Sequence, residues 1–171
     1  GSTGQRCTAT SRVIVEEDIY DRFISRLVER TQALKIGNGL DSDVEVGPLA
    51  SEAQFHIVMD YINLGVEEGA KLICGGNALT GDIFDDGYYI EPTIFTDVRP
   101  DMRVAQEEIF GPVLTVSKAR DLDHAMEISN GVKFGLSSSI YTRDLTQAFR
   151  YVNLIEAGMV HVNSPTLGGE V

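Results

Sequence analysis

A cysteine flanked by arginines is the residue of this chain best suited by type to act as a nucleophile. Cys7 lies between Arg6 and Arg12, in a run that begins with Gly4-Gln5. A thiol attacks a carbonyl only as thiolate, so its ordinary pKa of about 8.5 must be lowered for work near neutrality. The two arginines supply positive charge nearby in sequence. A short helix beginning near Gln5 would also aim backbone N–H groups at the sulfur and at a developing oxyanion. A buried structural cysteine, with both arginines in solvent, is the competing interpretation.

An acidic pair beside an aromatic residue forms a second candidate site. Glu107 and Glu108 precede Ile109-Phe110 and the rigid pair Gly111-Pro112. A carboxylate can accept hydrogen bonds from both hydroxyls of a ribose, and a neighbouring aromatic side chain can pack against a flat ring. A solvated pair of surface glutamates is the alternative. Together the two segments predict a nucleophilic thiol and a carboxylate site that folding brings together.

Several other chemistries lack their residues. His56, His124 and His161 stand far apart, and no Cys-x-x-Cys or His-x-x-x-His pair occurs, so we expect no metal site and no Cys-His dyad. No Gly-x-Gly-x-x-Gly or Walker-type loop is found, so the chain lacks a phosphate cradle of its own. Cys74 ends a short apolar run and is expected to be a small buried hydrophobic residue.

Composition indicates one soluble domain. The chain has 171 residues, of which 43% are hydrophobic and 23% charged, enough to bury a substantial core. The net charge of −12 argues against a nucleic-acid partner, because such binding requires a surplus of Lys and Arg. No apolar run approaches the roughly 20 residues that span a bilayer, and no signal peptide opens the chain, so we expect no membrane association and a cytoplasmic location.

Strands and helices alternate along the chain, which predicts an α/β fold. Hydrophobic periodicity and capping residues predict strands at 13–15, 71–74, 88–95, 113–116, 138–141 and 159–162, and helices over about 20–34, from Ser51 to Gly69, after Asp121 and after Asp144.

Details of four of these elements can be tested against the structure. Strand 71–74 is expected to be buried, and Pro92 predicts that strand 88–95 is irregular or at an edge. The spacing of Ser51 and Gln54 is that of a capping box. The last helix is expected to turn one stripe inward, made of Leu145, Ala148, Phe149 and Val152.

Taken in order, the motifs make the chain recognisable. It resembles the aldehyde dehydrogenase superfamily, whose thiol-bearing catalytic domain it covers almost from end to end. Each motif is weak alone, but their order is specific. They are Gly4-Gln5-Arg6-Cys7, Gly47-Pro48-Leu49, Tyr61-Ile62, Glu68-Gly69-Ala70-Lys71, Gly75-Gly76, Tyr88-Tyr89-Ile90-Glu91-Pro92-Thr93, Glu107-Glu108-Ile109-Phe110-Gly111-Pro112, Tyr141-Thr142-Arg143-Asp144-Leu145 and Ala157-Gly158-Met159-Val160-His161-Val162-Asn163.

The resemblance implies a fold and a mechanism. Residues 1–171 would form part of a three-layer α/β/α catalytic domain. Cys7 would attack an aldehyde to give a thiohemiacetal, with its backbone N–H holding part of the oxyanion. Hydride transfer to NAD or NADP would leave a thioester that water hydrolyses to a carboxylic acid.

The resemblance also implies roles for residues that would surround the cysteine. By position Glu108 would bind the nicotinamide ribose, Phe110 would lie beside the nicotinamide ring, and Gln54 would lie near the same ribose. A loop beginning at Asn163-Ser164-Pro165-Thr166 would contact the aldehyde.

Other family parts are expected outside this chain. The general-base glutamate, the asparagine of the oxyanion hole and the dinucleotide-binding domain would precede residue 1, and the oligomerisation strand would follow residue 171. The cofactor would therefore be bound mainly by the absent domain, which also leaves NAD and NADP undistinguished. We expect the chain alone to be inactive and the full-length protein to be a homodimer or homotetramer.

Two segments bear on the substrate. The runs 4–12 and 162–171 most resemble members that oxidise semialdehydes of dicarboxylic acids, such as 2-oxoglutarate semialdehyde. Two alternatives stay open. One is an enzyme that releases the thioester to coenzyme A or works on an acyl phosphate, and the other is a non-catalytic protein that retains the fold.

Overall fold

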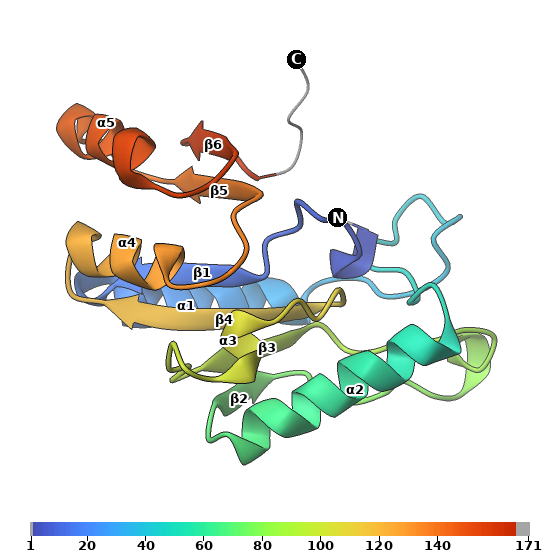
Figure 1. Cartoon of the computed structure of the whole chain (residues 1–171). Helices are drawn as coiled ribbons and strands as arrows, with labels where there is room; N and C mark the ends of the chain where they lie inside the picture. Colours follow the sequence, from blue (N-terminus) through green and yellow to red (C-terminus); the bar gives the residue numbers. More distant parts are fainter. Residues whose placement is uncertain (1, 167–171) are drawn as a thin grey trace.

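Two β-sheets organise the chain in the computed structural model, which describes residues 2–166 (Figure 1). The larger has four strands in the order β1-β4-β3-β2, with β1, β4 and β3 parallel and β2 antiparallel to β3. The smaller pairs β5 and β6 in parallel. The strands are β1 (Arg12–Glu16), β2 (Lys71–Cys74), β3 (Thr93–Thr96), β4 (Val113–Ala119), β5 (Ser137–Ile140) and β6 (Met159–Val162).

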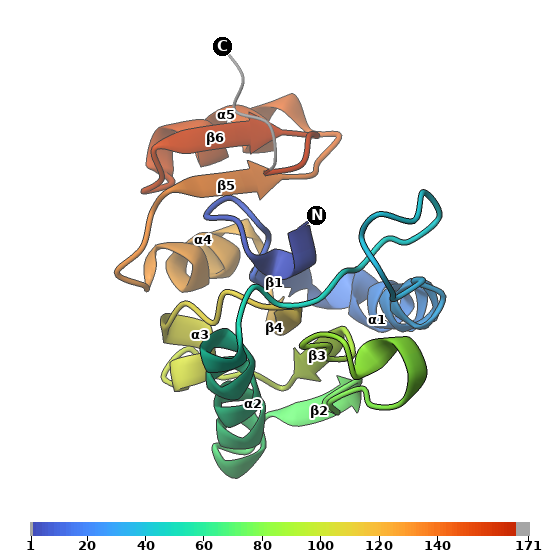
Figure 2. The ribbon, with the colours of Figure 1, turned by 90° about the vertical axis from the view of Figure 1, so that its right-hand side faces the viewer.

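Helices cover both faces of the four-stranded sheet (Figure 2). One face is covered by α1, and the other by α2, the short α3 and α4. The helices are η1 (Ser2–Gly4), α1 (Glu17–Gln32), α2 (Glu52–Glu67), η2 (Asp82–Phe84), α3 (Arg103–Gln106), α4 (Leu122–Asn130) and α5 (Leu145–Leu154). The chain is therefore a mixed α/β fold, as its alternating elements predict.

The alternation of side chains along each strand produces a separate core on each face. Ile94 of β3 packs with Val116 of β4 in the cluster under α1. Its neighbour Phe95, fully buried, packs with Val58 of α2 in the other cluster. The interior of the sheet is thus packed on both faces, which holds the ends of β3 and β4 in place.

Two strand predictions are wrong about position in the sheet, although the expected irregularity of 88–95 is confirmed, because Tyr88 and Ile90 make only isolated bridges and the regular strand begins at Thr93. Strand β3 is interior, with β4 on one side and β2 on the other, and all four of its residues are buried. Pro92 lies immediately before Thr93, outside the strand, so it removes no donor from the ladder. Strand β2 forms the edge of the sheet instead, which leaves Lys71 and Leu72 exposed rather than buried.

The predicted inner stripe of α5 is also largely wrong. Ala148 is buried as expected, but it is joined by Tyr151, while Leu145, Phe149 and Val152 are exposed by 70%, 62% and 44%. This helix carries apolar residues on two faces, so periodicity alone does not identify the buried one.

The predicted helix starts are confirmed by their caps. Ser51 Oγ accepts from Gln54 N at 3.2 Å, and Asp121 Oδ1 accepts from His124 N at 2.8 Å. Asp144 Oδ1 accepts from the amides of the second and third residues of α5. Each cap satisfies backbone donors that a helix leaves free at its first turn. Within residues 2–166 no helix combines the length and apolarity needed to cross a membrane.

Candidate active site

The cysteine segment and the acidic segment meet at one small hollow. Cys7, Glu108 and Phe110 all line it, and the cavity volume is about 50 Å³. Cys7 is exposed, as are Glu108 and Phe110, whereas Ile109 between them is buried. The folded chain thus sets an accessible thiol beside an accessible carboxylate and an aromatic ring. The rest of the wall comes from Gly4, Arg6, Ala9, Thr10, Ser11, Ile109, Gly111 and Val113.

Side chains before Cys7 fasten its segment to the chain that leads into α2. Thr3 Oγ1 donates to the Gly47 carbonyl at 3.1 Å. Gln5 Oε1 accepts from Ala50 N at 2.9 Å. These two hydrogen bonds link residues far apart in sequence and so fix the position of the loop that carries the thiol. Contacts with sequence neighbours alone would leave that loop free to move.

The expected helix near Gln5 is not found. Helix η1 ends at Gly4, and Cys7 lies in a turn that Ala9 N closes by donating to the Arg6 carbonyl at 2.9 Å. One such turn provides no helix dipole of the kind expected. The prediction that helix N–H groups aim at the sulfur is therefore wrong.

The two arginines near Cys7 differ in role. Half-buried Arg12 donates to the carbonyls of Ile128 at 3.3 Å and Ser129 at 3.1 Å, near the end of α4, and burial lowers its pKa. It satisfies carbonyls that a helix end leaves free. Arg6 is exposed and lines the hollow with Cys7. Only Arg6 of the pair thus adds its charge to the hollow.

Gln54 reaches the acidic segment from α2. Its Nε2 donates to the carbonyls of Ile109 at 2.9 Å and Phe110 at 3.1 Å. Phe110 has φ of +57°, a left-handed conformation that a side chain adopts only when its surroundings hold it there. Gln54 therefore supports the backbone of the loop, rather than completing a capping box with Ser51.

The start of the expected substrate loop lies partly beside the cysteine segment. Thr166 Oγ1 donates to the Thr8 carbonyl at 2.8 Å, one residue after Cys7. Asn163 exchanges two hydrogen bonds with the Thr142 backbone, each 2.9 Å long. Ser164 accepts from Ser139 through its carbonyl, and Pro165 is exposed. Thr166 thus lies near the hollow and Asn163 joins strand ends, whereas residues 167–171 lie outside the described residues.

Sequence reasoning missed the network around Glu107. Its carboxylate accepts from Tyr61 Oη at 2.6 Å and pairs with Arg103 at 2.9 Å. These hydrogen bonds, that of Arg103 foremost, lower the pKa of Glu107 to about 2. The i, i+4 spacing of Arg103 and Glu107 is the sequence signal for this pair.

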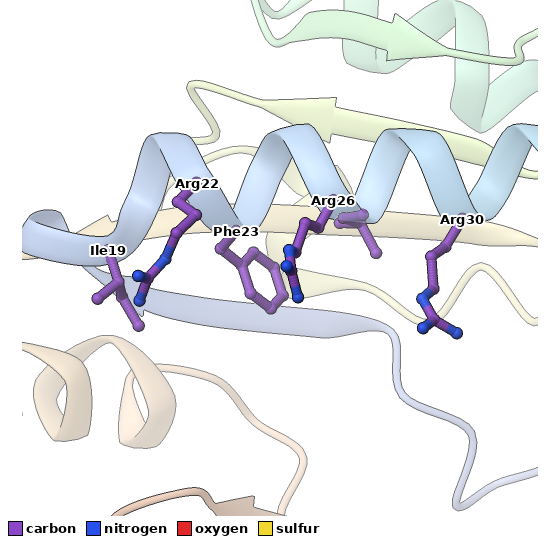
Figure 3. A pocket seen from close by; sticks show the side chains of 6 residues that line it. Ile19, Arg22, Phe23, Arg26 and Arg30 are labelled. Atoms are coloured by element: carbon purple, nitrogen blue, oxygen red, sulfur yellow. The ribbon is translucent and has the colours of Figure 1, made fainter.

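A wider hollow lies along α1, with a cavity volume of about 490 Å³ (Figure 3). Its lining includes none of the candidate site residues. Among the described residues, no group of three or more His, Cys, Asp or Glu could hold a metal ion. The lining residues are Ile19, Arg22, Phe23, Arg26, Leu27 and Arg30.

Comparison with known proteins identifies the class. Residues 1–171 match the sequence model of the family described as "Aldehyde dehydrogenase family". The chain therefore belongs to the aldehyde dehydrogenase family.

Individual relatives are named for different aldehydes. The chain is 48% identical to an alpha-ketoglutarate semialdehyde dehydrogenase of Haloferax volcanii, over the whole chain and 35% of that relative. Its identity to an alpha-ketoglutaric semialdehyde dehydrogenase of Bacillus subtilis is 45%, over 99% of the chain and 35% of the relative. The crystal structure of betaine aldehyde dehydrogenase from Staphylococcus aureus in complex with NAD+ superposes with a TM-score of 0.93 at 35% identity, covering 95% of this chain and 32% of that one. The chain thus spans about a third of the length of these relatives.

Proposed function

We propose that this chain is the thiol-bearing part of an NAD(P)-dependent aldehyde dehydrogenase that converts an aldehyde to a carboxylic acid. The observation that carries the proposal is the shared hollow of exposed Cys7, Glu108 and Phe110. The same observation favours assigning residues 1–171 to a partial α/β/α catalytic domain rather than to a dinucleotide-binding domain. The absence of a glycine-rich phosphate loop from the sequence agrees with that assignment.

The chemistry follows from the residues around the hollow. The Cys7 thiolate adds to the aldehyde carbon and forms a thiohemiacetal, whose oxygen carries the negative charge. Loss of hydride from that carbon leaves a thioester on Cys7. Attack by water then releases the carboxylic acid and returns the thiolate.

The cofactor fits the acidic segment. A carboxylate such as that of Glu108 can accept both hydroxyls of a ribose, and the exposed ring of Phe110 offers a flat apolar surface. When bound, NAD(P)+ supplies the hydride acceptor. Gln54 would act through the loop backbone that it supports.

For the substrate we propose an aldehyde that bears a carboxylate, such as a semialdehyde of a dicarboxylic acid. Arg6 is exposed in the same hollow as Cys7, and its guanidinium suits a carboxylate by charge and geometry. The Haloferax and Bacillus relatives are named for a semialdehyde of this class, whereas a relative of Mesorhizobium japonicum with 46% identity is named betaine aldehyde dehydrogenase, so Arg6 carries the argument. Betaine aldehyde, which the Staphylococcus enzyme is named for, carries a positive charge that cannot pair with Arg6, so we expect it to be the poorer substrate.

Activity assays of the full-length protein test the proposal. Cofactor reduction is measured with 2-oxoglutarate semialdehyde and with betaine aldehyde, and the products are analysed with and without coenzyme A. We expect a dicarboxylic acid, no acyl-coenzyme A, and loss of turnover in Cys7→Ala. Turnover that survives Cys7→Ala would refute the role of the thiol, and an acyl-coenzyme A product would assign the chain to the acylating relatives.

A second test measures aldehyde oxidation by the 171-residue chain alone. We expect it not to oxidise aldehydes, since the resemblance places the general base and most of the cofactor site elsewhere in the longer protein. Cofactor-dependent turnover by the isolated chain would show that expectation to be wrong.

A further inference from the structure

Helix α2 contacts the acidic segment at two points. Gln54 and Tyr61 lie about two helical turns apart on α2, hence on one face. Gln54 donates to the carbonyls of Ile109 and Phe110, while Tyr61 Oη donates to Glu107 Oε2 at 2.6 Å. Glu108 lies between these anchors.

Arg103 completes the anchor at Glu107. Arg103 Nε lies 3.0 Å from Glu107 Oε1 and Arg103 Nη2 lies 2.9 Å from Glu107 Oε2, so the guanidinium donates hydrogen bonds to both carboxylate oxygens. It also lies 5.8 Å from the centre of the Tyr61 ring. The backbone N of Arg103 donates to Glu68 Oε1 at 3.1 Å, which fixes the start of α3 against the end of α2. Glu107 is thus held from two helices that are in contact with each other.

The Glu108 side chain has no such partners of its own. Among residues 2–166 its carboxylate accepts no hydrogen bond and forms no ion pair. The positions of its Cα and Cβ are therefore set by the backbone on either side, at Glu107 and at Ile109. Because Phe110 is held at positive φ, this loop needs external support to keep its shape.

We propose that Tyr61 and Arg103 are positioning residues, which hold the Glu107 carboxylate and thereby aim Glu108 into the hollow beside Cys7. This inference rests on the proposed function, because the ligand of Glu108 is the nicotinamide ribose only in a dehydrogenase. The network would then set the affinity for the cofactor without contacting it.

Kinetics of the full-length enzyme test the proposal. In Tyr61→Phe the ring stays and the hydrogen bond to a charged group is lost, so we expect the KM for NAD(P)+ to rise about tenfold. The KM for the aldehyde and the rate of Cys7 alkylation should not change. Tyr141→Phe is the matched control, because that side chain is 68% exposed. A Tyr61→Phe enzyme with an unchanged cofactor KM, or with equal rises in both KM values, would overturn the positioning role.

Arg103→Gln should raise the same constant by a similar factor, about tenfold, since Arg103 bonds to both oxygens of the Glu107 carboxylate. Arg99→Gln is its control, because Arg99 is equally exposed at 57% and pairs with Asp101 instead. The double variant should show less than the product of the two single effects, because both residues act through one carboxylate. Strictly multiplicative effects would contradict that shared route.

Amide hydrogen exchange separates this proposal from the proposed function. Exchange at residues 107–111 should quicken in Tyr61→Phe and stay unchanged in Tyr141→Phe, whether or not the enzyme turns over. A wild-type enzyme that does not reduce NAD(P)+ would refute the proposed function. Normal turnover with unchanged exchange in Tyr61→Phe would refute the positioning role alone.

Discussion

Gly4 approaches Gly111 so closely that neither backbone leaves room for a side chain at residue 4. A Cβ on Gly4 would lie 2.0 Å from the Gly111 carbonyl oxygen and 2.6 Å from its carbon. Gly4 also has φ of +73°, which an L side chain rarely adopts. This contact joins the segment of Cys7 to the segment of Glu108 and Phe110, so the shape of the hollow depends on it.

Gly4→Ala should therefore damage both stability and activity. The overlap is with backbone, which cannot turn aside, so we expect a loss of about 2 to 3 kcal/mol in unfolding free energy. Gly39→Ala is the control, because a Cβ there meets nothing within 4 Å, and it should stay within about 0.5 kcal/mol. Urea unfolding of both variants measures the difference. Equal midpoints would show that the two segments are free to move apart.

The two cysteines should differ sharply in reactivity. Cys7 is exposed, whereas Cys74 is half-buried, and burial together with the nearby Glu91 raises the pKa of its thiol. At pH 7.5 iodoacetamide should therefore alkylate Cys7 at least about ten times faster than Cys74, because the thiolate is the reacting form. Peptide mass spectrometry after timed quenching measures both rates in one sample. Equal rates would favour a non-catalytic protein that keeps the fold.

Acid should remove the contribution of Glu107 in a defined range. Its folded pKa of about 2 lies below the ordinary value of 4.5, so the charged form is favoured by folding. The resulting stability is present above pH 4.5 and is lost as the pH falls towards 2. The difference in unfolding midpoint between wild type and Glu107→Gln should thus be constant from pH 6 to 8 and shrink below pH 4.5. A difference that persists undiminished at pH 2 would contradict this assignment.

The sequence located most of the regular elements because their signals are local. The caps at Ser51, Asp121 and Asp144 each act on amides within three residues, and the apolar runs of the strands are short and distinct. Whether a strand lies at an edge is decided by its neighbours in space. That is why Pro92 misled about β3, which begins one residue later between two other strands.

In the candidate site, too, the sequence predicted the local features and missed those set by contacts between distant segments. Residue types drew attention to Cys7 and Glu108, but nothing in sequence indicated that Arg12 would turn towards the end of α4 instead of the thiol. Likewise only one of the two hydrogen bonds of the predicted capping box forms, that from Gln54 N to Ser51 Oγ. The Gln54 side chain does not return to Ser51, because two carbonyls of a distant loop lie within its reach.

Arg6 should decide which aldehydes are good substrates. In the full-length enzyme, Arg6→Gln removes the one charge of this arginine pair that lines the hollow. We expect kcat/KM for 2-oxoglutarate semialdehyde to fall about 10- to 100-fold, the range for losing a charge-assisted hydrogen bond. An uncharged aldehyde of similar length should lose less than about threefold, because it makes no such bond. The preference of the wild type for the acid-bearing substrate should also weaken as salt screens the charge. If Arg6→Gln slowed both aldehydes equally, the guanidinium would be acting on the Cys7 thiolate rather than on the substrate, and the proposed substrate class would lose its structural support.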